Sequence, residues 1–319
     1  MSTKFYETMA AEREDSPDLQ LCISKTVDQL LKLDTSIGRP GILLGKIQSG
    51  KTRAFLGVIA DAFDKGYEIA IVLTKGTISL AEQTIRRIEK DFETFIQSDR
   101  VQVFDIMSLP SNLTKYHLNQ KIILVVKKED DNLKRLIIAF STKYPALVTK
   151  RLLIIDDEAD FASVTFRKSK GEITPGVISQ KIDELRDLVA TSSFLQVTAT
   201  PYSLYLQPDQ AAIKDGQPLF KPKRPAFTEL LPIHSYYVGG DYYFEKSIEP
   251  NSSAYYFYEE VPLQEREALR KQDGRRLALE HVLTEKNVKV LRRAVMNFAV
   301  GAVVRRHQQL EAGQPVQKI

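Results

Sequence analysis

The feature that most constrains this chain is an eight-residue stretch at residues 45–52, GKIQSGKT, which matches the phosphate-binding loop pattern in full. An apolar run at residues 41–44, of the kind that forms a buried strand, precedes it, and a helix-like segment at residues 53–65 follows. Strand, loop and helix in this order place backbone amides and a helix N-terminus around a phosphate chain. The order predicts an α/β fold that binds a nucleoside triphosphate.

Each residue type in this loop has a physical task. Its glycines let the backbone wrap the phosphates, Lys51 neutralises the β and γ phosphates, and Thr52 offers a hydroxyl to magnesium. ATP and magnesium are therefore the ligands we expect. The predicted nucleotide-binding residues are Gly45, Lys46, Ile47, Gln48, Ser49, Gly50, Lys51 and Thr52.

A second apolar run ends in a cluster of acids, RLLIIDDEAD at residues 151–160. It predicts a buried parallel strand whose carboxylates would repel one another without a cation. Magnesium at a phosphate needs an Asp at the strand's C-terminal edge, and an attacking water needs a neighbouring carboxylate to orient it and take its proton. We assign these roles to Asp157 and Glu158. Asp156 takes the metal role instead if the strand ends one residue earlier.

The third element is residues 194–201, FLQVTATP, an apolar strand followed by small hydroxyl residues and a proline. Thr198, Ala199 and Thr200 are candidates for sensing the γ phosphate and coupling the nucleotide site to a second ligand. A strand followed by Thr and Pro is ordinary turn chemistry on its own. The weight of this third motif comes from its place after the glycine-rich loop and the acidic cluster.

The order of the three motifs, with DEAD spelled at residues 157–160, resembles the first motor domain of superfamily-two helicases and translocases. A narrower resemblance rests on TATPY at residues 198–202, FTELLP at 227–232 and YVGGDYYF at 237–244. Together with the glycine-rich loop, these look like the endonuclease-associated family named for its Z-one domain. The likeness runs from about Ser36 to the end of the chain, with poorly matching spacers between the motifs.

The resemblance implies a helicase-like ATPase of a prokaryotic restriction or phage-defence system, associated with nuclease function. It implies nucleic acid as a partner, and we expect DNA. Superfamily-two enzymes hydrolyse ATP between two RecA-like domains, of which the second supplies arginine fingers. The chain ends about where the related family would begin that domain. We therefore expect a fragment that binds nucleotide but hydrolyses it slowly.

Contacts to nucleic acid are predicted at two strand ends. Thr74, Lys75 and Gly76 follow the apolar run at residues 67–74, and the equivalent segment of superfamily-two motors touches the nucleic-acid backbone. Lys127 and Lys128 follow the run KIILVV at residues 121–126 and would face the ligand-binding edge of a parallel sheet. A solvated loop lysine and a charged turn are the simpler readings of these two sites.

Strand starts at Gly41, Tyr67, Val101, Lys121, Arg151 and Phe194 alternate with helical segments. This alternation predicts a RecA-like, mostly parallel sheet with helices on both faces. We divide the chain into residues 1–35, a loose leader to Pro17 and then a helix; 36–205, the motor domain; 206–262, a Tyr- and Pro-rich insertion or connector; and 263–319, a helical segment leading to a second motor domain. The tyrosines of residues 236–258 either stack on bases or pack within short strands.

Composition limits the remaining choices. The 319-residue chain has no run of about eighteen apolar residues and a polar N-terminus, so we expect a cytoplasmic protein without a membrane partner. Its single cysteine and four scattered histidines do not suggest a metal-bound nuclease centre, and no restriction-type acidic cluster stands outside the ATPase motifs.

Two functions compete on the sequence. The first is a nucleic-acid motor in which Lys51, Asp157 and Glu158 carry hydrolysis. The second is a nucleotide-gated switch that controls a nuclease or sensor partner without translocation. A P-loop kinase is a weaker third reading, because kinases lack a DEAD-type strand end followed by TAT.

Overall fold

The structure, a computed structural model, describes residues 4–47, 49–75, 78–157, 166–169, 172–175, 177–200, 212–214, 217–220, 224–234, 237–269 and 288–313. The chain divides into two units, Met1–Tyr237 and Val238–Ile319. The first unit contains a large sheet with its helices, and the second contains short helical turns and two helices.

A seven-stranded parallel sheet forms the centre of the first unit, in the order β11-β1-β8-β5-β2-β4-β3. The predicted α/β class with a parallel sheet is confirmed, and all six predicted strands are present. Their apolar runs fit a sheet that is buried on both faces. The strands are β1 (Gly41–Leu44), β2 (Ile69–Thr74), β3 (Val101–Asp105), β4 (Lys121–Lys127), β5 (Arg151–Asp157), β8 (Thr191–Thr198) and β11 (Phe227–Leu230).

The strand β11 comes from the segment that the sequence divides off as an insertion or connector, residues 206–262. It pairs in parallel with β1, from Gly41 opposite Phe227 to Leu44 opposite Leu230. A Cβ atom at Gly41 would lie 2.6 Å from the Phe227 ring, so this glycine lets the two strands approach. The sheet therefore extends beyond residue 205.

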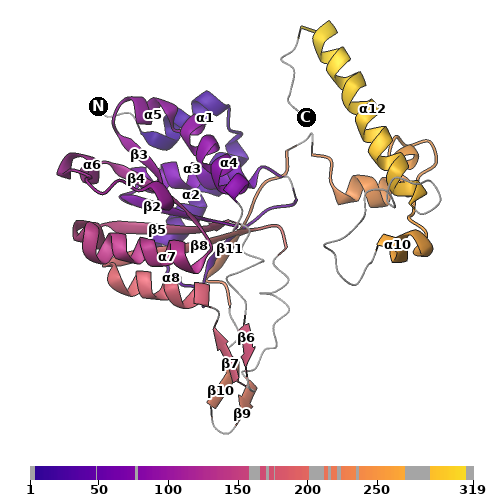
Figure 1. Ribbon diagram of the computed structural model, residues 1–319. Helices are drawn as coiled ribbons and strands as arrows, with labels where there is room; N and C mark the ends of the chain where they lie inside the picture. The colour runs from indigo at the N-terminus through magenta and orange to yellow at the C-terminus, as the bar shows by residue number, and fades with distance from the viewer. Residues whose placement is uncertain are drawn as a thin grey trace. The chain divides into compact units, whose positions relative to one another are not determined.

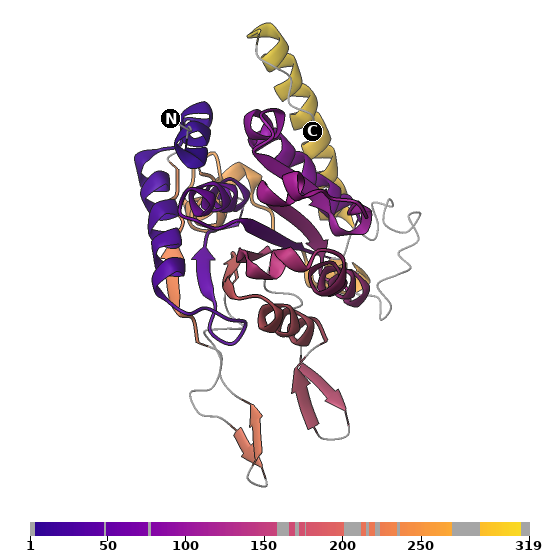
Figure 2. The ribbon, with the colours of Figure 1, turned by 90° about the vertical axis from the view of Figure 1, so that its left-hand side faces the viewer.

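Helices cover both faces of the sheet, as Figures 1 and 2 show. One hydrophobic cluster, here called the α3-side cluster, joins one face to the helices α1 to α5. The other, the α7-side cluster, joins the opposite face to α7, α8 and the turns between them. The bounds are α1 (Phe5–Arg13), α2 (Pro17–Lys32), α3 (Lys51–Asp64), α4 (Ile78–Asp91), α5 (Glu93–Gln97), α6 (Lys115–Asn119), α7 (Asp130–Ile138), α8 (Val177–Leu188), and the turns η1 (Ile106–Ser108), η2 (Ala139–Lys143) and η3 (Pro145–Thr149).

Alternate residues of each strand belong to different clusters because side chains alternate across a sheet. In β5, Leu153 and Ile155 belong to the α3-side cluster, whereas Leu152 and Ile154 belong to the α7-side cluster. The same alternation determines on which face of the sheet each polar residue at the end of β5 lies.

The predicted loose leader is wrong. Residues 5–13 form α1, whose Phe5 and Met9 are buried in the α3-side cluster. The Asp64 carboxylate, at the end of α3, accepts hydrogen bonds from the backbone amides of Phe5 and Tyr6 at 2.8 and 2.9 Å. These bonds satisfy amides at the start of α1 that have no partner within the helix. The N-terminal segment is thus packed against the main core.

Two short antiparallel hairpins complete the described part of the first unit. β6 (Phe166–Ser169) pairs with β7 (Glu172–Pro175) after the acidic cluster. β9 (Ala212–Lys214) pairs with β10 (Gln217–Phe220) within the predicted Pro-rich insertion. Neither hairpin belongs to the seven-stranded sheet.

The second unit contains the tyrosine-rich region. The turns η4 (Asp241–Glu245), η5 (Lys246–Ile248) and η6 (Tyr255–Phe257) precede the helices α10 (Leu263–Leu269) and α12 (Lys289–Glu311). The described tyrosines lie in or beside helical turns, so their predicted packing within short strands is wrong. Tyr243, Tyr255, Tyr256 and Tyr258 are exposed. None of the helices in the described ranges combines the length and apolar character that crossing a bilayer requires.

Cys22 joins α2 to the edge of the sheet. Its thiol is buried and donates a hydrogen bond to the Leu230 carbonyl at 3.5 Å. Burial raises the pKa of the Cys22 thiol to about 11, and the nearby Glu229 carboxylate adds to this.

We expect Cys22 to react slowly with a thiol reagent at pH 8, because the thiolate is the reactive form and is scarce below the raised pKa. A kinetic assay of labelling by a chromogenic disulfide would measure this. The matched control is Leu21→Cys in a Cys22→Ala background, because Leu21 is the neighbouring residue in the sequence and its side chain is exposed. Equal labelling rates for the two cysteines in the folded protein would contradict the expected protection.

Candidate functional site

The three predicted motifs meet at one edge of the sheet. β8 lies between β1 and β5, and all three strands are parallel, so their carboxyl ends lie together. The chain leaves β1 toward β2 and leaves β8 toward β11, in opposite directions along the sheet. Ligands of open parallel sheets bind at such a reversal of direction, outside the carboxyl ends of the strands.

The glycine-rich loop, residues 45–52, connects β1 to α3. The Gly45 amide donates to the Thr198 carbonyl at 3.1 Å, which joins the start of the loop to the end of β8. Within the loop, the Ser49 amide and the Lys51 ammonium both donate to the Lys46 carbonyl, at 3.2 and 3.0 Å. The loop thus folds back so that Ser49 and Lys51 both contact the Lys46 carbonyl. Gln48 lies outside the described residues.

Two glycines explain the shape of this loop. Gly50, the N-cap of α3, has φ +87°, a left-handed conformation that a side chain would strain. At Gly45 the constraint is space, because a Cβ atom would lie 2.6 Å from Ser49 Oγ and 2.9 Å from Lys51 Cγ. The loop can therefore fold back on itself only with glycine at both positions.

The first turn of α3 begins at Lys51, so Lys51 and Thr52 lie at a helix N-terminus. Amides of a first helical turn have no partner within the helix, and the helix dipole adds positive potential there. Lys51 contributes a full positive charge to the same place. The arrangement favours an anion at the end of β1.

The alternation of β5 decides which aspartate faces this loop. Asp157 follows Leu153 and Ile155 in the two-residue period and so lies on the α3 side of the sheet, with Thr52. Asp156 lies on the other side and is completely buried. Of the two candidates for the metal role, Asp157 is the one that fits. Glu158, the predicted water-orienting carboxylate, lies outside the described residues, as does the rest of the DEAD sequence.

Asp156 is paired with a lysine from two strands away. The Lys128 ammonium lies 2.7 Å from Asp156 Oδ1 and donates to the Asp157 carbonyl at 2.8 Å. Lys127 is also buried, with its ammonium 3.4 Å from a Glu129 carboxylate oxygen. Both lysines were predicted to hold nucleic-acid phosphates. Their burial and their partners within the chain argue against that role. Their predicted position at the carboxyl-terminal edge of the sheet is confirmed.

The other predicted coupling and contact residues lie at neighbouring strand ends. Thr198 is buried, and its hydroxyl accepts a hydrogen bond from the Thr200 amide at 3.0 Å, so the threonines flanking Ala199 shape the turn after β8. Thr74 ends β2 and is also buried, which keeps its side chain from surface contacts. Lys75 is half-buried, and Gly76 lies outside the described residues.

Two residues far away in sequence contact the loop. Arg87 of α4 donates to the Thr52 hydroxyl at 3.2 Å. Tyr237 donates its hydroxyl to the Ile47 carbonyl at 2.7 Å, and its ring lies 5.9 Å from the Lys46 ammonium. The motif pattern of the loop contained no signal for either contact, because both depend on the tertiary fold.

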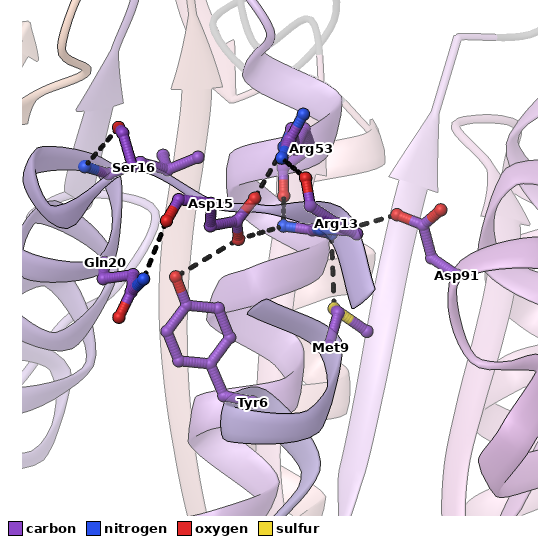
Figure 3. A network of polar contacts seen from close by, with 9 residues as sticks. Tyr6, Met9, Arg13, Asp15, Ser16, Gln20, Arg53 and Asp91 are labelled. Carbon is purple, nitrogen blue, oxygen red and sulfur yellow. Dashed lines mark hydrogen bonds and ion pairs between the residues drawn. The ribbon is translucent and has the colours of Figure 1, made fainter. Parts of the chain in front are cut away.

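A buried polar network fixes the start of α3 (Figure 3). The Asp15 carboxylate is completely buried and accepts hydrogen bonds from Arg13 at 2.7 Å and from Arg53 Nε at 2.6 Å. Arg13 also pairs with Asp91 of α4 at 3.0 Å. The Tyr6 hydroxyl donates to Asp15 at 3.3 Å, and burial, reinforced by this carboxylate, raises the pKa of Tyr6 well above its usual range. Arg53 follows Thr52 directly, so the network positions the predicted metal ligand.

Magnesium at this edge of the sheet would need oxygen donors. Among the described residues, no group of three or more His, Cys, Asp or Glu side chains is placed to hold a metal ion. Thr52 and Asp157 place two side-chain oxygen donors on the same side of the sheet. Magnesium at phosphates binds through one or two protein oxygens, with phosphates and waters as the other ligands. The residues present fit that mode.

Comparison with known proteins adds no family assignment. Models of protein families give no match to this chain, and curated protein sequences give none either.

We expect Gly45→Ala to weaken binding of a fluorescent ATP analogue by about tenfold, or ~1.4 kcal/mol, because the new methyl group would displace Ser49 and Lys51. A fluorescence titration would measure this. Gly38→Ala is the control, since its Cβ would meet only Ser36 Oγ, at 3.8 Å. Wild-type affinity in Gly45→Ala would show that the close packing of the loop is not required.

We expect Asp15→Asn to lower the free energy of unfolding by about 3 kcal/mol, because it leaves the half-buried cation of Arg13 without its main partner. Urea unfolding followed by circular dichroism would measure this. Asp28→Asn provides the comparison, because the Asp28 side chain is 48% exposed in its pair with Lys65 and should cost less than about 1 kcal/mol. A similar loss in the two variants would contradict a special role for the buried network.

Proposed function

We propose that this chain is the nucleotide-binding part of a helicase-like, RecA-like motor that binds and hydrolyses ATP and acts on nucleic acid. The observation that supports it most is the adjacency of β1, β8 and β5, which brings the glycine-rich loop, Asp157 and the TAT turn to one sheet edge. A P-loop NTPase needs these parts at one place. Motif order and topology thus support the same function.

In this proposal each residue has a defined task. Lys51 and the first amides of α3 bind the β and γ phosphates. Thr52 and Asp157 hold magnesium, which when bound neutralises charge on the phosphates. Glu158 orients the attacking water and takes its proton. Thr198 and Thr200 shape the turn that would respond to the γ phosphate and couple it to nucleic acid.

Further charge stabilisation must come from outside these residues. Phosphoryl transfer is accelerated strongly by arginine fingers. We propose that a second RecA-like domain supplies them, and that the chain by itself hydrolyses ATP slowly. The sequence resemblance extends the proposal to a restriction or anti-phage defence protein of the prokaryotic cytoplasm, with DNA as the nucleic acid and a nuclease as associated activity or partner.

The second candidate, a nucleotide-gated switch, is favoured by one contact. Tyr237 is the last residue of the first unit and donates to the Ile47 carbonyl of the loop. Phosphate binding that reshapes the loop would therefore act on the segment that leads out of this unit. Such a contact serves a switch that controls a partner without translocation.

The deciding experiment is ATP hydrolysis by the chain together with its proposed second RecA-like domain, with and without single-stranded and duplex DNA. Binding of the ATP analogue should be detectable in the wild type and weakened in Lys51→Ala. Hydrolysis should fall by about 10²-fold or more in Glu158→Gln, which removes the base. Stimulation by DNA that disappears in Glu158→Gln supports the motor.

The other outcomes are equally informative. Hydrolysis that is unaffected by any nucleic acid favours the switch and directs the search to a protein partner. Wild-type chain that binds no nucleotide, or Lys51→Ala that binds it normally, contradicts both candidates.

A further inference from the structure

Lys128 connects three strand ends beside the candidate site. It follows β4, and its side chain reaches past the end of β2 to β5, where it meets the Asp156 carboxylate at 2.7 Å and the Asp157 carbonyl at 2.8 Å. Its own backbone amide donates to the Thr74 carbonyl, the last residue of β2, at 2.9 Å. One residue thereby cross-links the ends of β4, β2 and β5.

Lys128 and Asp156 form a fully buried ion pair. The side chains of Lys128 and Asp156 are 1% and 0% exposed. Removing two charges from water costs more than most such pairs return, so a buried pair is seldom retained for stability alone. A pair of this kind is better explained by the geometry that it specifies.

The geometry concerns Asp157. Asp156 is held on the α7 side of the sheet, and the Asp157 carbonyl is held by the same ammonium. With the last residues of β5 fixed in this way, the alternation of the strand directs the Asp157 side chain to the α3 side, where Thr52 lies. The position of the predicted metal carboxylate depends on a lysine on the opposite face.

We propose that Lys128 is a positioning residue that sets the Asp157 carboxylate for magnesium and ties it to the Thr74 end of β2. This inference rests on the proposed function, because it assigns the magnesium of the same nucleotide site. In this role Lys128 acts through the end of β5, by its contacts with Asp156 and the Asp157 carbonyl. Groups that orient a metal ligand from outside the coordination sphere affect metal affinity by about 10- to 100-fold.

The test separates metal binding from nucleotide binding. Lys128→Met removes the ammonium, and the double variant Lys128→Met/Asp156→Leu also removes the carboxylate that would be left buried without a partner. Lys127→Met is the matched control, because its ammonium pairs with Glu129, whose side chain is 43% exposed. Binding of the ATP analogue without a divalent ion, and Mn²⁺ binding to the ATP complex by electron paramagnetic resonance, are measured for each protein.

We expect Mn²⁺ affinity to fall at least tenfold in both Lys128 variants, while affinity for metal-free ATP stays within twofold of wild type. Lys127→Met should leave both affinities unchanged. Wild-type Mn²⁺ affinity in the double variant overturns the inference. A double variant that does not fold also overturns it, because Lys128 would then hold the fold rather than the carboxylate. Wild-type protein that binds no ATP contradicts the proposed function instead.

Discussion

The parallel pairing of β1 with β8 and of β8 with β5 is the constraint on which the candidate site depends. Residues 45–52, 156–157 and 198–200 lie far apart in sequence, and only this pairing places them at one edge. The register makes the placement specific: Leu44 lies opposite Thr198, and Val197 lies opposite Asp157. Because both pairings are parallel, every strand delivers its carboxyl end to the same edge.

The start of α3 is held from outside the glycine-rich loop as well as by it. Arg13, the last residue of α1, pairs with Asp91 of α4, and Asp15, just after α1, pairs with Arg53 of α3. Two helices therefore fix the first turn of a third, which contains Lys51 and Thr52 of the proposed phosphate site. Anchoring of this kind reduces the reorganisation that a bound ligand would otherwise require. The N-terminal segment contributes to the site without touching it.

The central strands could be predicted because buried parallel strands are nearly continuous apolar runs, as in residues 121–126. β11 escaped prediction because its sequence, FTEL, alternates and lies at an edge, where its half-buried residues resemble a loop. α1 was missed because it is a short helix within a polar N-terminal stretch, and only its residues Phe5, Tyr6, Met9 and Ala10 are buried. Lys128 was placed correctly at the carboxyl end of β4, but sequence alone could not show that its ammonium turns inward to Asp156.

Sequence alone also could not distinguish the two adjacent aspartates at the end of β5, because composition and spacing do not show which way each side chain points. Their roles separate only through the two-residue period of the strand and the helices on each face. A shift of β5 by one residue would bring Asp156 toward Thr52 and carry Asp157 to the side of Lys128. The Lys128–Asp156 pair opposes the shift that would bring Ile155 opposite Lys128, because the fully buried ammonium would then have no carboxylate partner. The pair therefore contributes to the choice of the aspartate that faces the glycine-rich loop.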